Sequence, residues 1–77
     1  MPRTEPPVVV ARRHVVEFEH RVERQRELLE RLERGKNSPM IVAEARKVLE
    51  TLEQSLRLAR AHLQLEIDHY GDQGETP

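Results

Sequence analysis

The sequence predicts an all-α protein, an antiparallel two-helix coiled-coil hairpin that dimerises into a four-helix bundle. Apolar residues recur at alternating steps of three and four on both sides of residues 35–38, a spacing typical of left-handed coiled coils. Residues 35–38 contain the signals that end one helix and begin another. The second helix also carries more apolar surface than one partner helix can cover, which predicts the dimer.

The composition excludes several classes of function. The 77 residues contain no cysteine, which excludes disulfides, thiolate catalysis and the usual structural zinc sites. No apolar run approaches the roughly 18 residues of a membrane span, and residues 1–7 lack the apolar core of a signal peptide. We therefore expect a cytoplasmic protein that does not bind membranes. The net charge is only −1, so the molecule as a whole is not a polycation built for nucleic acid.

The first helix is expected to span residues 6–34. Pro6 and Pro7 suit a first helical turn, where a backbone donor is not needed, and Thr4 can cap that turn. Residues 1–5 are expected to be disordered. The coiled-coil positions of this helix are Val8, Ala11, Val15, Phe18, Val22, Gln25, Leu29 and Leu32.

Residues 35–38 are expected to form the turn of the hairpin. Gly35 follows the helix at the position where a left-handed residue often satisfies the last free carbonyls, and glycine adopts that conformation at little cost. Asn37 or Ser38 can accept a hydrogen bond from the first free amides of the next helix, and Pro39 fits its first turn. So short a connection favours antiparallel neighbours.

The second helix is expected to span residues 39–70, with Gly71 as its stop signal and residues 72–77 as a disordered tail. Its spacing repeats that of the first helix for about four heptads. The coiled-coil positions are Val42, Ala45, Leu49, Leu52, Leu56, Ala59, Leu63, Glu66 and Tyr70.

The register follows from the position of the turn, because residues equally distant from Asn37 face each other when the chain reverses there. The expected pairs are Leu32 with Val42, Leu29 with Ala45, Val22 with Leu52, Phe18 with Leu56, Val15 with Ala59, and Ala11 with Leu63. Gln25 falls opposite Leu49 in this register. It either pairs within the hairpin and helps to fix the register, or reaches solvent.

One side of this seam carries charged residues, which test the register. Of two offsets, one brings only like charges together and the other brings only opposite charges together. The second offset predicts ion pairs between Glu19 and Arg60, Arg26 and Glu53, and Glu33 and Arg46.

The other side of the seam predicts the dimer interface. A hairpin of this length buries little surface, and a second copy would cover the surplus apolar residues of the second helix. The predicted interface consists of Leu28, Ile41, Val48, Ser55, Leu58, His62 and Leu65. The alternative is a monomer that leaves Leu58 and Leu65 exposed. His14 lies across from His62, and such a pair would weaken assembly below about pH 6.

No enzyme or metal site is expected. Glu17 with His20, and Glu66 with His69, have the Glu-x-x-His spacing that di-iron bundles use. However, the first pair falls on the outer face of its helix, and further inward glutamates at matching depth are missing. No catalytic residue or cofactor is expected either, since the chain offers no nucleophile with a base and no phosphate-binding loop.

A stripe of basic residues along the outside of the first helix offers an alternative function. It consists of Arg13, His20, Arg24, Arg31 and Arg34. In a dimer, two such stripes could contact the phosphates of RNA or DNA. Glu17 and Glu27 interrupt the stripe, which favours a solvated surface instead.

The chain resembles a group of short bacterial helical-hairpin proteins. The resemblance covers residues 14–17 and 21–32 of the first helix and several positions of the second helix. These positions are Ala45, Leu49, Leu52, Leu56, Leu58, Arg60, His62 and Leu63. That group has no established activity, so the resemblance implies no catalytic or binding residues. We expect a small adaptor that binds itself and another protein, with nucleic-acid binding as the alternative.

Overall fold

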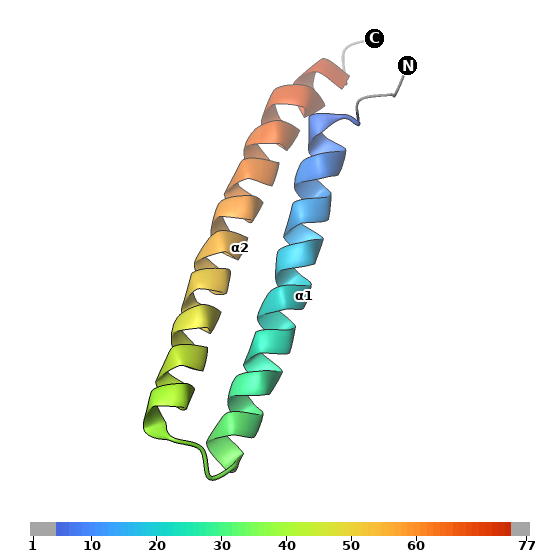
Figure 1. The fold of residues 1–77 in the computed structure, drawn as a ribbon. Coiled ribbons are helices and arrows are strands. Elements are labelled where there is room, and N and C mark those ends of the chain that lie inside the picture. Colours follow the sequence, from blue (N-terminus) through green and yellow to red (C-terminus); the bar gives the residue numbers. More distant parts are fainter. Residues whose placement is uncertain (1–4, 75–77) are drawn as a thin grey trace.

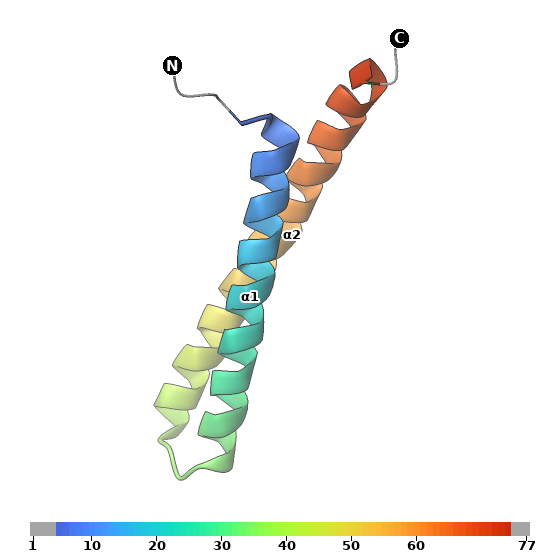
Figure 2. The same cartoon turned by 90° about the vertical axis from the view of Figure 1, so that its right-hand side faces the viewer.

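The computed structural model describes residues 5–74 and consists of two long helices packed against each other. Helix α1 spans Pro7–Arg34 and helix α2 spans Pro39–Gly74. The helices run antiparallel along their length (Figure 1) and cross at a shallow angle (Figure 2). No strand occurs within residues 5–74. The prediction of an all-α helical hairpin is therefore confirmed.

The core is the single seam between α1 and α2. Its buried residues are Ala11, Val15, Val22 and Leu29 of α1, and Ala45, Leu49 and Leu56 of α2. Six half-buried residues pack around them: Phe18, Leu32, Val42, Leu52, Ala59 and Leu63. Every one of these residues occupies a predicted coiled-coil position, because the heptad spacing keeps one stripe of each helix turned toward its partner.

Gln25 is satisfied within the seam. Its side-chain amide is half-buried and donates a hydrogen bond to the backbone carbonyl of Ala45, at 3.0 Å. Of the two interpretations of this residue, pairing within the hairpin is therefore correct. The bond joins α1 to the backbone of α2 and satisfies an amide that the seam half-buries, which would otherwise cost free energy.

The turn differs from the prediction at Gly35. This residue is extended, with φ −89° and ψ 173°, rather than left-handed. Its N–H donates to the carbonyl of Arg31 at 3.1 Å, and the Asn37 side chain donates to the carbonyl of Leu32 at 2.9 Å. Two carbonyls at the end of α1 are thus satisfied without a left-handed residue. Glycine is favoured here by space, since an added Cβ would lie 2.8 Å from Nδ2 of Asn37.

The predicted capping of α2 is confirmed at Ser38. The Ser38 hydroxyl accepts a hydrogen bond from the N–H of Ile41 at 3.2 Å, and Pro39 occupies the first position of the helix. This arrangement satisfies one of the free amides that begin every helix. The chain therefore reverses within residues 35–38.

The outer ends of the helices differ slightly from the prediction. Helix α1 begins at Pro7 with Pro6 as its N-cap and has no side-chain cap; the predicted cap Thr4 lies outside the described residues. Helix α2 continues through Gly71 to Gly74, four residues beyond the end predicted at residue 70. The disorder predicted for residues 1–4 and 75–77 lies outside the described residues. A glycine costs a helix about 1 kcal/mol relative to alanine, which weakens the helix without ending it.

No helix in the described part of the chain is long and apolar enough to cross a membrane. The two helices expose charged side chains along most of their outer faces.

The crowding at the turn predicts the effect of Gly35→Ala. The new Cβ would displace the Asn37 side chain and break its hydrogen bond to Leu32, so we expect the free energy of unfolding to fall by about 1 kcal/mol. Asn37→Ala should cost a similar amount, and the double variant should cost little more than either single change. Urea unfolding at one fixed protein concentration measures all three. Additive losses would show that the two residues act independently.

Candidate interaction surface

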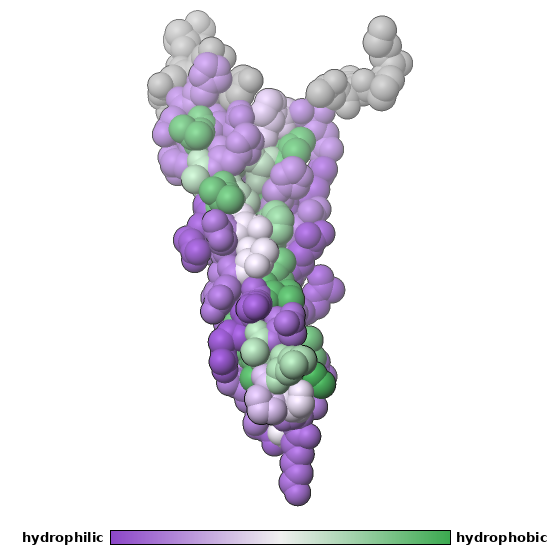
Figure 3. Space-filling model, turned by 60° about the vertical axis from the view of Figure 1, so that its left-hand side comes forward, coloured by the Kyte–Doolittle hydropathy of each residue, from purple (hydrophilic) through white to green (hydrophobic). Residues whose placement is uncertain are grey.

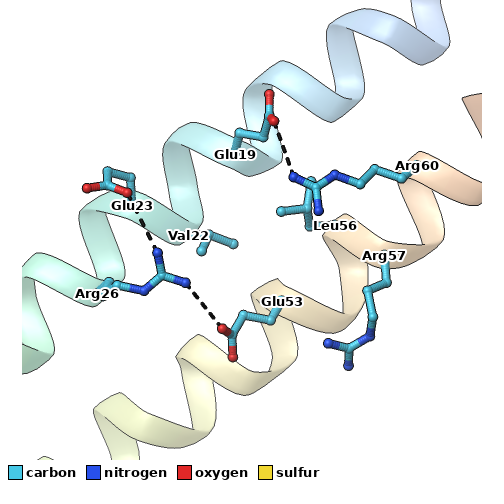
Figure 4. A pocket seen from close by; sticks show the side chains of 8 residues that line it. All are labelled: Glu19, Val22, Glu23, Arg26, Glu53, Leu56, Arg57 and Arg60. Carbon is cyan, nitrogen blue, oxygen red and sulfur yellow. Dashed lines mark hydrogen bonds and ion pairs between the residues drawn. The ribbon is translucent and has the colours of Figure 1, made fainter.

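The side of the hairpin that carries the predicted charges is closed by ion pairs between the helices. All three predicted pairs are present: Glu19 with Arg60 at 3.3 Å, Arg26 with Glu53 at 3.3 Å, and Glu33 with Arg46 at 3.0 Å. We call these six residues the charged flank. Two of the pairs bridge a shallow depression above Val22 and Leu56 of the core (Figure 4).

The ion pairs of the charged flank contribute more to register than to stability. Their side chains are between about one third and three fifths exposed, and exposed ion pairs contribute only about 0.2 to 1 kcal/mol each. A shift of one helix by a heptad would bring like charges together at every pair. The charged flank therefore penalises the wrong offset.

The opposite side of the hairpin has no such closure. The seven residues of the predicted dimer interface lie here, and we call them the apolar flank: Leu28, Ile41, Val48, Ser55, Leu58, His62 and Leu65. The large apolar side chains on α2 are well exposed, at 51% for Ile41, 46% for Val48, 64% for Leu58 and 68% for Leu65. Leu28 of α1 is 38% exposed, Ser55 is half-buried and His62 is exposed.

An apolar groove runs between the helices on this side. It is lined by Ala11, His14 and Phe18 of α1, and by Ser55, Leu58, Ala59 and His62 of α2. Three of these residues, Ala11, Phe18 and Ala59, belong to the coiled-coil seam; Ala11 is buried, whereas Phe18 and Ala59 are only half-buried. In the view of Figure 3, apolar patches form a broken row along the molecule between polar side chains. The structure thus brings His14 and His62 to one groove, as the register predicted.

The sequence did not single out a second apolar patch, at the start of α1. Val8, Val9 and Val16 line it together with the stems of Arg12 and Arg13. Val9 and Val16 are 44% and 45% exposed. They are seven residues apart, so they occupy the same heptad position outside the seam, and this spacing was the signal that could have revealed them.

Carboxylates partly neutralise the basic stripe proposed for nucleic acid. Arg13 forms a two-pronged ion pair with Glu5, and this hydrogen bonding lowers the pKa of Glu5 and raises that of Arg13. Arg34 lies 3.9 Å from the carboxylate of Glu30 and also donates to its backbone carbonyl at 3.4 Å. Two of the four arginines of the stripe are therefore already paired within α1 and the residues just before it.

The rest of the basic stripe also has acidic neighbours. His20 and Arg24 line a shallow depression on α1, and Glu17 lines it with them. Arg31 is exposed on the same helix. The stripe therefore alternates in sign, unlike the continuous positive surface that phosphate backbones favour.

The histidines do not form a metal centre with the carboxylates of the described residues. Within residues 5–69, whose side chains the structure describes, no group of three or more metal-binding side chains comes together. His62 instead lies 3.5 Å from Glu66 on the next turn of α2. Glu17 and His20 line the shallow depression on the outside of α1.

Comparisons with known proteins add no functional residues. No protein-family model, no curated protein and no solved structure matches the chain. Function is therefore inferred from the surfaces of the hairpin itself. The apolar flank contains five of the eight large apolar side chains that are exposed among the described residues.

The charged flank predicts the effect of reversing one charge. Arg26→Glu would place a carboxylate beside Glu53 and Glu23, so we expect the free energy of unfolding to fall by about 1 kcal/mol in low salt. Adding Glu53→Arg should restore most of the loss, since it rebuilds the pair in the opposite direction. Urea unfolding at one protein concentration checks both variants.

Arg57→Glu is the matched control for this experiment. Arg57 lines the same depression, but its guanidinium points away from the ion pairs (Figure 4). The control should change stability by less than Arg26→Glu does. In about 1 M salt, where the Debye length falls to about 3 Å, the difference between the two variants should shrink. If the double variant Arg26→Glu, Glu53→Arg is no more stable than Arg26→Glu alone, this register is contradicted.

Proposed function

We propose that this chain is a non-enzymatic, cytoplasmic interaction module that dimerises through its apolar flank and, as a dimer, binds another protein. The observation that carries the proposal is the exposed stripe of Ile41, Val48, Leu58 and Leu65 along one face of α2. Singly exposed leucines are ordinary on protein surfaces. Four large apolar residues in one row, beside an open groove, are typical of an interface.

The thin core supports the need for a partner. Among residues 5–69, whose side chains the structure describes, only seven side chains are buried, and the least exposed of them, Ala11, retains 2% of its accessible surface. Ordering the backbone costs about 1 to 2 kcal/mol per residue, and a single seam offsets little of that cost. A second copy of the same chain would bury additional apolar surface on both chains.

The size of the apolar flank suits a dimer. The stretch of α2 from Ile41 to Leu65 is about 36 Å long at 1.5 Å per residue, and two helices side by side are about 20 Å wide. A contact over this face would cover about 700 Å² of each copy, close to the roughly 800 Å² per partner of a standard stable interface. The result would be a four-helix bundle, in which each helix contacts two neighbours.

The apolar patch at the start of α1 supports a site for another protein. Val9 and Val16 lie at a heptad position next to the charged flank, so a dimer formed through the apolar flank would leave them exposed. Arg12 and Arg13 border the patch. Because Arg13 is paired with Glu5, Arg12 supplies most of the positive charge there. An amphipathic helix with apolar residues every third or fourth position and acidic residues beside them has the matching chemistry. Binding at this patch would give the dimer two identical sites.

Nucleic-acid binding is the second candidate. The exposed guanidinium groups of Arg24 and Arg31 on α1 favour it, and dimerisation would double the number of basic stripes. The pairing of Arg13 with Glu5 and of Arg34 with Glu30 counts against it. Protein binding is therefore the function that the surfaces support better.

The dimer predicts that Leu58→Glu will yield monomers. Leu58 belongs to the exposed row and is itself 64% exposed. Replacing it with a carboxylate removes about 2 kcal/mol or more of apolar burial per site and adds the cost of burying a charge. We expect the dissociation constant to rise by at least about a hundredfold. Sedimentation equilibrium from micromolar to millimolar concentration measures this change.

Val16→Glu is the control for Leu58→Glu. It introduces the same charge at another exposed apolar residue, which lies outside the apolar flank. Its dissociation constant should stay close to that of the unaltered chain. If the unaltered chain sediments only as a 9.0 kDa species at micromolar concentration, the dimer does not form and the proposal fails.

The second candidate predicts a mobility shift that the first does not. If protein binding is the function, the chain should not retard a short RNA or DNA duplex at about 50 mM salt, because its basic stripe is partly neutralised. A shift that disappears in Arg24→Glu, and that weakens steeply as salt is raised, would instead favour nucleic acid. Arg57→Glu, on α2, is the charge-matched control.

A further inference from the structure

Helix α2 carries a second heptad stripe beside the one that packs on α1. Starting at Ile41, its members recur at alternating steps of three and four: Ile41, Glu44, Val48, Thr51, Ser55, Leu58, His62 and Leu65. Seven of the eight are exposed, and Ser55 is half-buried. At about 100° per residue, the stripe lies roughly 100° around the helix from the first seam. That direction suits a second neighbour in a four-helix bundle.

The stripe is complementary to itself when it is reversed. Residues equally far from Glu53 in the sequence would then form each layer of the contact. The layers are Ile41 with Leu65, Val48 with Leu58, Thr51 with Ser55, and Glu44 with His62, each residue opposite its counterpart in the second copy. The large apolar residues all meet one another, the two small hydroxyl residues lie at the centre, and a carboxylate meets an imidazole.

We infer that the second copy packs with its α2 antiparallel to α2 of the first, so that the two turns lie at opposite ends and the two-fold axis passes beside Glu53. This inference rests on the proposed dimer and specifies its geometry. The same chain would present the same stripe twice, as an isologous two-fold interface requires.

A parallel contact between the two α2 helices is less favourable. In that arrangement every residue of the stripe would face its own counterpart. Glu44 would meet Glu44 and His62 would meet His62, which places like charges or unpaired imidazoles in the contact. The antiparallel arrangement avoids both contacts and keeps every large apolar residue against another.

A third arrangement packs α2 of one copy against α1 of the other, with both turns at the same end. It is also less favourable. The corresponding stripe on α1 is mostly charged: His14, Glu17, Arg21, Arg24, Leu28 and Arg31. The apolar stripe of α2 would then cover guanidinium groups and would itself stay poorly covered, which costs burial on both helices.

In the inferred arrangement, α1 faces α1 of the second copy, and the axis passes beside Arg21. Leu28 then meets His14, and Glu17 lies near Arg24 of the other copy, which is a favourable charge contact. Arg21 approaches its own counterpart, the single like-charged contact of this face. Its guanidinium lies over the ring of Phe18, with 5.3 Å between the guanidinium carbon and the ring centre, and it is exposed to solvent. Solvent screening keeps the cost of this contact small.

Cysteine cross-linking tests this geometry cleanly, because the chain has no cysteine of its own. Val48→Cys and Leu58→Cys chains are prepared separately, mixed, and oxidised with a mild disulfide redox buffer. Mass spectrometry distinguishes the mixed disulfide from the two homodisulfides, since the two variants differ in mass. Sedimentation of the reduced variants first establishes that each still dimerises. Val16→Cys mixed with Val48→Cys gives the background of random collisions.

The antiparallel register predicts that the mixed disulfide is the main product. Val48 and its counterpart would lie about 15 Å apart along the bundle, whereas the Cα atoms of a disulfide are within about 7 Å. Homodisulfides of either variant should therefore stay at background. Homodisulfides above the mixed product would overturn the inference in favour of parallel helices. If the variants dimerise but none of the three disulfides exceeds background, the inference is overturned in favour of a dimer in which α2 packs against α1 of the other copy. Variants that sediment only as monomers would remove the proposed dimer itself.

A second measurement does not depend on disulfide formation in the interface. Spin labels attached at Lys36→Cys, in the turn, should be about 50 Å apart if the turns lie at opposite ends, since the helical rise is 1.5 Å per residue. Pulsed electron paramagnetic resonance measures distances in this range. Labels closer than about 30 Å, roughly three helix diameters, would place the turns at the same end and overturn the inference.

Discussion

The apolar seam between α1 and α2 is the contact on which the rest of the structure depends. It aligns α1 with α2 from Ala11 to Leu63 and leaves the two sides of the seam to be completed differently. Because a hairpin has only one seam, every apolar residue outside it is exposed to solvent or covered by another molecule. The distribution of residues on the two sides of this seam is therefore the main functional information in the molecule.

The two sides differ in chemistry. On the charged flank, long side chains reach across the seam and join α1 to α2, so no partner is needed there. On the apolar flank, short apolar side chains leave a groove, with Leu58 and His62 among the residues that line it. One side thus specifies how the chain folds, and the other provides the surface from which we infer how it associates. Both depend on the same register, since a shift of one helix would misplace the ion pairs and the groove together.

The turn shows how a local requirement can be met in more than one way. A glycine after a helix usually indicates a left-handed residue, yet Gly35 is extended and leaves room for the Asn37 side chain. The two carbonyls at the end of α1 are satisfied by the N–H of Gly35 and by the Asn37 amide. The identity of the residue was consistent with both geometries, and only the contact with Asn37 distinguishes them.

The sequence by itself determined the hairpin, the coiled-coil positions and the three ion pairs of the charged flank. These features follow from spacing and charge along one chain, because heptad positions and a short turn leave a single register in which opposite charges meet. It did not determine whether Gln25 bonds to Ala45 or where α2 ends. Nor did it determine how far Leu58 and Leu65 extend into solvent. Those features depend on the distance between two helix surfaces and on the space left by neighbouring side chains, and only the packed tertiary structure decides them.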